Sequence, residues 1–281
     1  MKKAVQQMML GSICSDESKT LEILKKIKEA GYDGIELNSY MIHPTSALVR
    51  GLTKIYGMPS GNLGKYDWVK LLKDSNLEAI SLHTDLNSLE NNLKQVLEDS
   101  NKYNVKDIII TGLYNYPYHI KDNVLELADR LNKAGEKLLD NNFNLLYHNH
   151  NIELVKVDND KTAYDLLLEN TDSKYVNYEI DTYWFVDGGA NPLAMMKKLN
   201  DRMKYWHITD RGIRIKKQAI TPIVKYDSVE LGYGNIDLDS LFSYAKEKDI
   251  KAVVLESHKN WINNNPLDSI ILSSNYLNNK L

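Results

Sequence analysis

Short apolar segments rich in β-branched residues alternate along the chain with longer segments whose apolar residues have helical spacing. Parallel strands need connections that cross back over the sheet, so this alternation predicts parallel strands covered by helices. Strands are expected at residues 6–10, 34–37, 79–83, 107–111, 144–148, 176–180, 205–208 and 252–256. Helices are expected at residues 20–30, 66–75, 89–103, 124–140, 163–169, 192–199, 238–247 and 266–277. Eight strand–helix pairs in 281 residues favour a single (β/α)8 TIM barrel over residues 1–281.

An open, doubly wound sheet is the main alternative to the barrel. No Gly-x-Gly-x-x-Gly follows the first strand segment, and the chain has no phosphate loop with Gly-Lys-Ser/Thr. No stretch rich in Pro, Gly or Ser divides the chain, and no sequence repeat occurs. We therefore expect one domain.

Charge and cysteine content narrow the class of protein further. A net charge of -3 and an isoelectric point near 6.2 give no support to nucleic-acid binding. One cysteine, Cys14, excludes an internal disulfide framework and fits a reducing compartment. The first residues lack the apolar core of a secretion signal, and no apolar run approaches the roughly 18 residues of a membrane span. The expectation is a cytoplasmic protein without membrane contact.

Polar residues gather where the predicted strands end, which is the catalytic end of such barrels. Five of the seven histidines lie there or one step beyond, together with three acidic residues. They are His83, His148, His150, His207 and His258, and Glu36, Asp181 and Glu256.

Alternation along the last four strands predicts a metal site. Residues two apart share a face of a strand, so one side chain from each strand points to the barrel axis: His148, Asp181, His207 and Glu256. This mixed nitrogen and oxygen set suits Mn²⁺, with Co²⁺, Zn²⁺ or Fe²⁺ as alternatives, and it has no thiolate to select a soft metal. The other interpretation is a paired polar network without a cation, which is costly to bury unless every group has a partner.

Other residues near the strand ends have two interpretations each. Glu36 and Glu179 either orient metal-bound imidazoles or form structural ion pairs. His83 either binds a substrate hydroxyl or is a satisfied core histidine. Trp184 either covers the apolar face of a sugar ring or packs at the barrel end. His258 is interpreted as a solvated loop residue.

Five motifs, in order along nearly the whole chain, resemble one family. They are Gly31-Tyr-Asp-Gly-Ile-Glu36, Tyr147-His-Asn-His150, Glu179-Ile-Asp-Thr-Tyr-Trp184, His207-Ile-Thr-Asp210 and Leu231-Gly-Tyr-Gly-Asn-Ile-Asp237. Together they resemble the sugar phosphate isomerase/epimerase family, the xylose-isomerase-like TIM barrels. The resemblance is specific for the superfamily and weak for the reaction.

The resemblance implies a divalent metal, commonly Mn²⁺, held by four residues from strands 5 to 8. In ketose 3-epimerases these are Glu, Asp, His and Glu, and the two glutamates also move protons. Asp181, His207 and Glu256 match, but His148 replaces the first glutamate, so the shuttle between two glutamates is in doubt. The family also implies a homodimer.

The pair His148 and His150 also resembles the inosose dehydratases and related keto-sugar lyases, in which an acidic residue, here Glu153, follows. The frequent His-x-Lys-Asp motif is His207-Ile-Thr-Asp210 in this chain, so the lysine is absent. Endonuclease IV shares the fold but needs a richer set of ligands for three zinc ions.

The sequence is therefore compatible with three alternative functions. The first is a metal-dependent isomerase or epimerase of a sugar, keto-sugar or sugar phosphate, which removes a proton next to a carbonyl through a metal-stabilised enediolate. The second is a dehydratase of a cyclitol or 3-keto-sugar, and the third a non-catalytic sugar-binding barrel.

Residue roles follow from strand phase and from the motifs. Glu256 is assigned as metal ligand and base, and His150 as the partner acid. The residues assigned to substrate binding are His83, Trp184, Glu36 and Asp210. The basic run at 211–217 is more typical of a solvated loop than of a phosphate site, so a phosphorylated substrate is not predicted.

Overall fold

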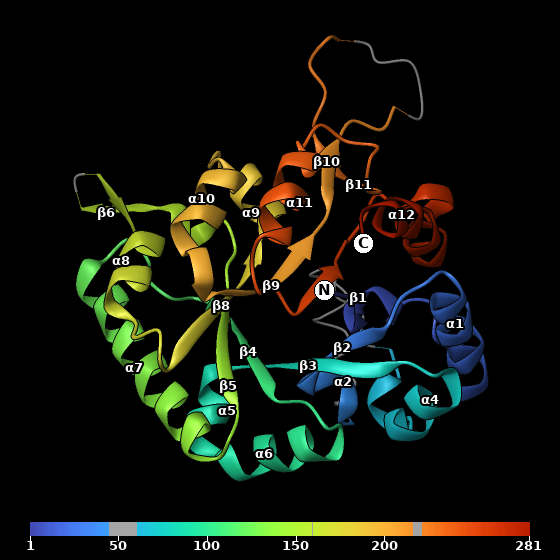
Figure 1. Cartoon of the computed structure of the whole chain (residues 1–281), viewed down its shortest axis with the longest axis horizontal. Helices are drawn as coiled ribbons and strands as arrows, with labels where there is room; N and C mark the ends of the chain where they lie inside the picture. The colour runs from blue at the N-terminus through green and yellow to red at the C-terminus, as the bar shows by residue number, and fades with distance from the viewer. Residues whose placement is uncertain (45–60, 159, 216–220) are drawn as a thin grey trace. The chain divides into compact units, whose positions relative to one another are not determined.

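Eight strands form a closed barrel in the order β1-β12-β9-β8-β5-β4-β3-β2, which confirms the predicted (β/α)8 fold (Figure 1). The computed structural model describes residues 1–44, 61–158, 160–215 and 221–281. The barrel strands are β1 (Lys2–Gln6), β2 (Gly34–Asn38), β3 (Glu78–Thr84), β4 (Asp107–Thr111), β5 (Asn144–His148), β8 (Val176–Asp181), β9 (Met203–Ile208) and β12 (Ala252–Leu255). Parallel pairing joins β1 with β2 and β12, and links β3, β4, β5, β8 and β9 in series.

Most of the predicted helices are present. The described helices of four or more residues are α1 (Glu17–Glu29), α2 (Ser39–Ile42), α4 (Trp68–Ser75), α5 (Leu86–Asn91), α6 (Leu93–Lys102), α7 (Lys121–Asp140), α8 (Ala163–Asn170), α9 (Thr182–Asp187), α10 (Pro192–Leu199), α11 (Leu238–Lys246) and α12 (Pro266–Lys280), with the 3-10 helix η1 (Gln7–Leu10). Of these, α2 and α9 were not predicted. Shorter 3-10 turns are η2 (Leu63–Lys65), η3 (Ile152–Leu154), η4 (Asn200–Arg202) and η5 (Ile262–Asn264). Two small ribbons pair β6 (Lys156–Asp158) with β7 (Lys161–Thr162) and β10 (Asp210–Gly212) with β11 (Asp227–Val229).

The chain forms two compact units. The first contains residues 1–80, 208–243 and 252–281, and the second contains residues 81–207 and 244–251. In the first unit α1 packs beside α4 and α12. Asp16 begins α1 by accepting a hydrogen bond from the Lys19 amide, and Gly31, with φ +96°, follows its end.

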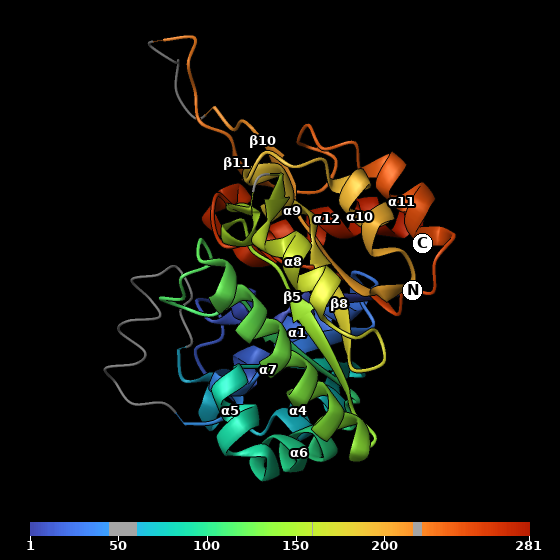
Figure 2. The same cartoon turned by 90° about the vertical axis from the view of Figure 1, so that its left-hand side faces the viewer.

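In the second unit the long helix α7 packs against α8 and β5, and its green ribbon runs along that strand in Figure 2. Leu127, Leu131 and Leu138 form part of its buried face and are fully covered. Their spacings of four and seven residues place them on one side of a helix.

The predicted first strand, 6–10, was wrong. The strand is Lys2–Gln6, and residues 7–10 form η1. The Gln6 side chain accepts a hydrogen bond from the Met8 amide at 2.7 Å, which turns the chain out of the strand although the run that follows is apolar. The charge of Lys2 does not prevent strand formation because its exposed ammonium pairs with Glu78.

The helix predicted at 89–103 is two helices, α5 and α6. They meet at Asn92, whose backbone dihedrals of φ -142° and ψ 38° are not helical. In the part of the chain that the structure describes, no helix is both long and apolar enough to cross a membrane.

Candidate metal centre

Three of the four predicted metal ligands lie at the carboxyl ends of neighbouring strands in the second unit. His148 is the last residue of β5, Asp181 the last of β8, and His207 the penultimate residue of β9. The strand register places His148 opposite Glu179 and Asp181 opposite His207. All three predicted ligands are buried, and each offers a ligand atom within 4.8 Å of the others.

The fourth predicted ligand, Glu256, follows β12 and belongs to the first unit. Its side chain is buried, and its Oε2 lies 3.7 Å from Nε2 of His258. The His258 side chain is partly exposed. The role of Glu256 as a ligand beside His148, Asp181 and His207 stays a prediction.

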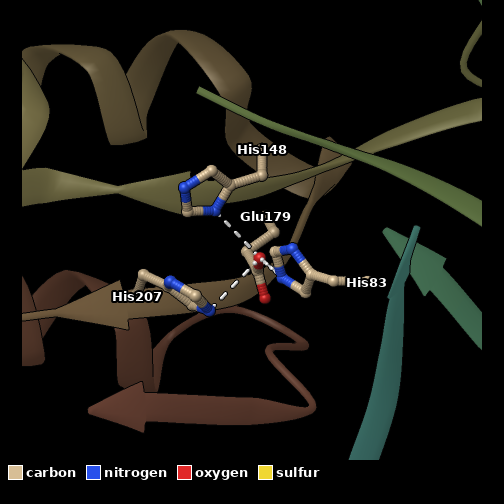
Figure 3. Close-up of side chains that lie close together, drawn as sticks. All are labelled: His83, His148, Glu179 and His207. Carbon is tan, nitrogen blue, oxygen red and sulfur yellow. Dashed lines mark hydrogen bonds and ion pairs between the residues drawn. The ribbon is translucent and has the colours of Figure 1, made fainter. Parts of the chain in front are cut away.

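The Glu179 carboxylate lies among three imidazoles of the same unit (Figure 3). Its Oε2 is 2.9 Å from Nε2 of His83, 2.9 Å from Nδ1 of His148 and 3.3 Å from Nε2 of His207. All four side chains are buried, and they form a second group whose ligand atoms lie within 4.8 Å of one another. Of the two interpretations of Glu179, the structure supports contact with the predicted ligand histidines. His83 faces this carboxylate, while a substrate contact for it stays a prediction.

Electrostatics keep Glu179 ionised. Burial by itself raises the pKa of the carboxyl group, but the neighbouring His207 and His83 and the hydrogen bonds from His148 and His207 outweigh it. The pKa of Glu179 is therefore held well below its usual range.

The donor set fits a divalent cation. Imidazole nitrogens and carboxylate oxygens without a thiolate suit Mn²⁺, Fe²⁺, Co²⁺ or Zn²⁺. Oε1 of Glu179 is buried without a hydrogen-bond partner among the residues the structure describes, and an unsatisfied buried acceptor costs about 1–3 kcal/mol. A cation bound by the neighbouring His148 and His207 would offset part of that cost. The buried His, Asp and Glu residues could therefore bind a metal.

Glu153 organises the segment that carries His150. Its Oε2 accepts from the His150 amide at 3.0 Å, and its Oε1 accepts from the Tyr147 hydroxyl at 2.6 Å. Burial raises the pKa of Glu153 although both hydrogen bonds lower it. The reasoning from strand phase missed Tyr147, because it points away from the face that carries His148. Glu153 could be identified from the sequence only through the resemblance to the inosose dehydratases.

The end of β4 is shaped around the Glu153 carboxylate. A Cβ atom at Gly112 would lie 2.5 Å from Oε1 of Glu153 and 3.1 Å from the Tyr118 hydroxyl. A side chain at this position would displace the carboxylate that holds the His150 segment. Glycine at this position leaves room for the carboxylate.

The His150 ring lies between two other rings. Its centroid is 5.0 Å from that of His148 and 5.5 Å from that of Trp184. The Trp184 amide donates to Oδ1 of Asp181 at 3.2 Å, so Asp181 also caps α9. Trp184 is thus fixed next to the predicted acid, and its contact with a sugar ring stays a prediction.

Asp210, predicted to bind substrate, organises a loop of the first unit. Its carboxylate accepts from the backbone amides of Arg211, Gly232, Gly234 and Ile236, at distances of 2.8 to 3.2 Å. Burial raises the pKa of Asp210 although these bonds oppose it. These bonds involve both carboxylate oxygens, so Asp210 supports this loop, and a substrate contact for it stays a prediction.

The remaining candidates are also placed in the first unit. Glu36 is completely buried in β2, opposite Gln6 of β1. In the basic run, the Arg211 guanidinium lies 5.3 Å from the Tyr226 ring centroid, and Arg214 pairs with Glu230. Lys216 and Lys217 lie outside the described residues.

Sequence comparison identifies relatives over almost the whole chain. The model of the xylose isomerase-like TIM barrel family matches residues 24–278. An inosose dehydratase of Clostridium tetani is 26% identical over 172 residues, which is 58% of this chain and 57% of that enzyme. An inosose dehydratase of Clostridium botulinum is 22% identical over 269 residues, which is 92% of this chain and 89% of that enzyme.

Solved structures show the same fold. A sugar phosphate isomerase/epimerase from Parabacteroides distasonis has a TM-score of 0.74 at 20% identity, covering 98% of this chain and 93% of that chain. The IOLI protein with a bound zinc atom has a TM-score of 0.69 at 17% identity, covering 100% and 98%. The match of the family model, the closed barrel and the ordered motifs show that this chain belongs to the xylose isomerase-like TIM barrel family.

Proposed function

We propose that the protein is a divalent-metal-dependent isomerase or epimerase of a sugar, keto-sugar or sugar phosphate. The observation that supports it is the convergence of His148, Asp181 and His207 at the carboxyl ends of β5, β8 and β9. Active sites of these barrels lie at that end of the strands. Membership of a family with isomerase and epimerase members agrees with it.

The proposed metal ligands are His148, Asp181, His207 and Glu256. When bound there, a divalent ion acts as a Lewis acid for the charge that develops on substrate oxygen during proton removal. Mn²⁺ is our first choice because two of the four ligands are carboxylates, and the zinc in a structural relative makes Zn²⁺ the second.

The protein's own residues would move the proton. Glu256 is proposed to take it from the carbon next to the carbonyl, because a carboxylate at that strand end can reach a substrate in the barrel mouth. His150 is proposed to return it, since its amide is fixed by Glu153 and its ring lies against Trp184. The proposed substrate contacts are His83, Trp184, Glu36 and Asp210, and the proposed substrates are carbohydrates or cyclitols.

Dehydration of a cyclitol or 3-keto-sugar is the second candidate. It starts with the same proton removal but ends with loss of a hydroxyl group, which needs an acid at the leaving oxygen. The His148–His150 ring pair could supply that acid, and both Clostridium relatives are inosose dehydratases. A sugar-binding barrel without catalysis is the third.

Proton NMR in D₂O tests these candidates directly. Purified protein with added Mn²⁺ is incubated with keto-sugars and cyclitols, which are freed of the metal before spectra are recorded. An isomerase or epimerase incorporates deuterium next to the carbonyl and keeps every carbon–oxygen bond, whereas a dehydratase releases water and gives an unsaturated enol or its diketone tautomer. Ligand-dependent stabilisation without exchange would contradict both enzymatic proposals.

Two variants separate metal binding from proton transfer. Mass spectrometry is expected to find roughly one equivalent of metal in the parent protein, and Asp181→Asn is expected to lose both this metal and the exchange. Glu256→Gln is expected to lower exchange at least 100-fold, since general-base catalysis contributes about 10²–10⁴-fold. Full exchange and full metal content in Glu256→Gln would contradict the assignment of the base.

A further inference from the structure

One oxygen of Glu179 serves three histidines from three different strands. Oε2 faces Nε2 of His83 on β3, Nδ1 of His148 on β5 and Nε2 of His207 on β9 (Figure 3). The rings also pack on one another, with centroids 4.6 Å apart for His148 and His207 and 5.6 Å apart for His83 and His207. This packing restricts ring rotation, so the nitrogen that each ring turns toward Glu179 is fixed.

The contacts differ between the two predicted metal ligands. A neutral imidazole has one N–H and one nitrogen with a lone pair, and only the lone pair binds a metal. Three ring nitrogens converge on the single oxygen Oε2, which accepts from them, so this geometry places the proton of His148 on Nδ1 and that of His207 on Nε2. In the neutral rings that metal binding requires, the lone pairs are then on Nε2 of His148 and on Nδ1 of His207.

We propose that Glu179 is a positioning residue that sets opposite tautomers of His148 and His207 and thereby selects which ring nitrogen of each binds the metal. This inference rests on the proposed metal centre of His148, Asp181, His207 and Glu256. It assigns Glu179 a place outside the ligand set, although its carboxylate belongs to a group that could itself hold a cation.

The arrangement around Glu179 is poorly suited to a purely structural ion pair. A structural pair is most stable when both carboxylate oxygens are satisfied, whereas here all three contacts converge on Oε2 and Oε1 is buried without a partner among the described residues. Convergence on one oxygen forces all three imidazoles to present an N–H to the same point. That is the requirement for setting tautomers.

The tautomers are measured first in the metal-free wild-type protein. Protein labelled with ¹⁵N-histidine gives long-range ¹H–¹⁵N correlations that identify the protonated nitrogen of each ring. We expect His148 to be protonated on Nδ1 and His207 on Nε2. The opposite tautomer at either residue, or averaging between both, would overturn the inference whatever the variants do.

Two substitutions of Glu179 then test whether its carboxylate sets these tautomers. Glu179→Leu removes the acceptor at similar volume and is expected to release both tautomers and to weaken Zn²⁺ binding about 10–100-fold. Glu179→Gln keeps a carbonyl oxygen that accepts hydrogen bonds and is expected to restore the tautomers and most of the affinity. Wild-type tautomers and Zn²⁺ affinity in Glu179→Leu would overturn the proposal.

Asp107→Asn is the matched control for loss of a buried carboxylate. Asp107 begins β4 in the same unit, where Lys251 and Tyr205 donate to it at 2.7 Å and 3.0 Å. We expect this variant to lose stability but to keep the histidine tautomers and the Zn²⁺ affinity. A tautomer change in it as large as that in Glu179→Leu would show a general loss of packing and overturn the assignment.

Titration with diamagnetic Zn²⁺ separates this inference from the proposed function. The expected result is a shift at Nε2 of His148 and Nδ1 of His207, with the Nδ1 proton of His148 retained. Loss of that proton would place the metal beside Glu179 and overturn the inference. No Zn²⁺ or Mn²⁺ uptake, with the expected tautomers present, would contradict the proposed function and support the tautomer assignment alone.

Discussion

Cys14 illustrates how position controls the chemistry of a single residue. Its side chain is 3% exposed, and burial raises the pKa of the thiol to about 11, although a hydrogen bond with Thr20 lowers it. The thiolate is the nucleophile in thiol reactions, so its population and its accessibility are both low near neutral pH.

We therefore expect Cys14 to be almost unreactive in the native protein. At pH 8 about 0.1% of a thiol with this pKa is ionised, so Ellman's reagent should label it only on the time scale of unfolding. Labelling should be complete and stoichiometric in 6 M guanidinium chloride. Complete labelling of the folded protein within minutes would contradict the buried position, and Cys14→Ser provides the blank.

At the scale of single elements, local hydrogen bonds determine where helices begin. In α8 the Thr162 hydroxyl accepts from the Asp165 amide at 3.1 Å, and the Asp165 carboxylate accepts from the Thr162 amide at 2.9 Å. This is a reciprocal capping box, and Lys198 also pairs with Asp165. The pKa of Asp165 is lowered because these hydrogen bonds outweigh its partial burial.

The contribution of this cap should depend on pH. Because the pKa of Asp165 is lower in the folded state, its stabilisation is present above the pKa of the unfolded chain and is lost as pH falls through the folded pKa. Asp165→Asn is expected to lower the free energy of unfolding by about 1 kcal/mol at pH 7, with the difference from wild type shrinking in acid. Urea denaturation as a function of pH measures it.

Two variants of Thr162, the other residue of the capping box, serve as controls. Thr162→Ser keeps the hydroxyl acceptor and should leave the free energy of unfolding within about 0.5 kcal/mol of wild type, whereas Thr162→Ala should lose about 1 kcal/mol. If Asp165→Asn lowered stability equally at all pH values at which the protein is folded, the carboxylate would not be the source of the cap's stability.

At the scale of the whole molecule, the proposed metal couples the site to folding. A ligand that binds only the folded state raises stability by RT ln(1 + [L]/Kd), about 2.7 kcal/mol at 100-fold excess over Kd. For a chain of this length we expect Mn²⁺ to raise the melting temperature by roughly 5–10 °C. Calorimetry with and without EDTA measures this shift.

The site variants make this thermal test specific. Asp181→Asn should show no shift with Mn²⁺, while Asp107→Asn should show the wild-type shift from a lower starting temperature. An equal shift in Asp181→Asn would mean that the stabilising ion binds elsewhere. The expected homodimer and cytoplasmic location stay predictions that this measurement does not test.

Patterns within the sequence determined the type and order of most of the barrel elements. The strands at Asp107–Thr111 and Asn144–His148 and the helix at Pro192–Leu199 have the predicted bounds, because apolar periodicity and helix caps are local properties. The same periodicity placed His148, Asp181 and His207 at strand ends. For these features, neighbouring residues carry all the necessary information.

Only the tertiary structure decided what those side chains contact. The first strand begins at Lys2, where the chain pairs with Ala252 of β12 and the Lys2 side chain pairs with Glu78. Both partners are distant in the sequence, so no local pattern could place this end of the strand. Likewise, the sequence offered Glu179 either an ion pair or a role beside metal ligands. The register of β5, β8 and β9 decided between them, since it places one carboxylate oxygen against nitrogens from three strands. Such contacts depend on strand pairing across long sequence separations, which no local pattern records.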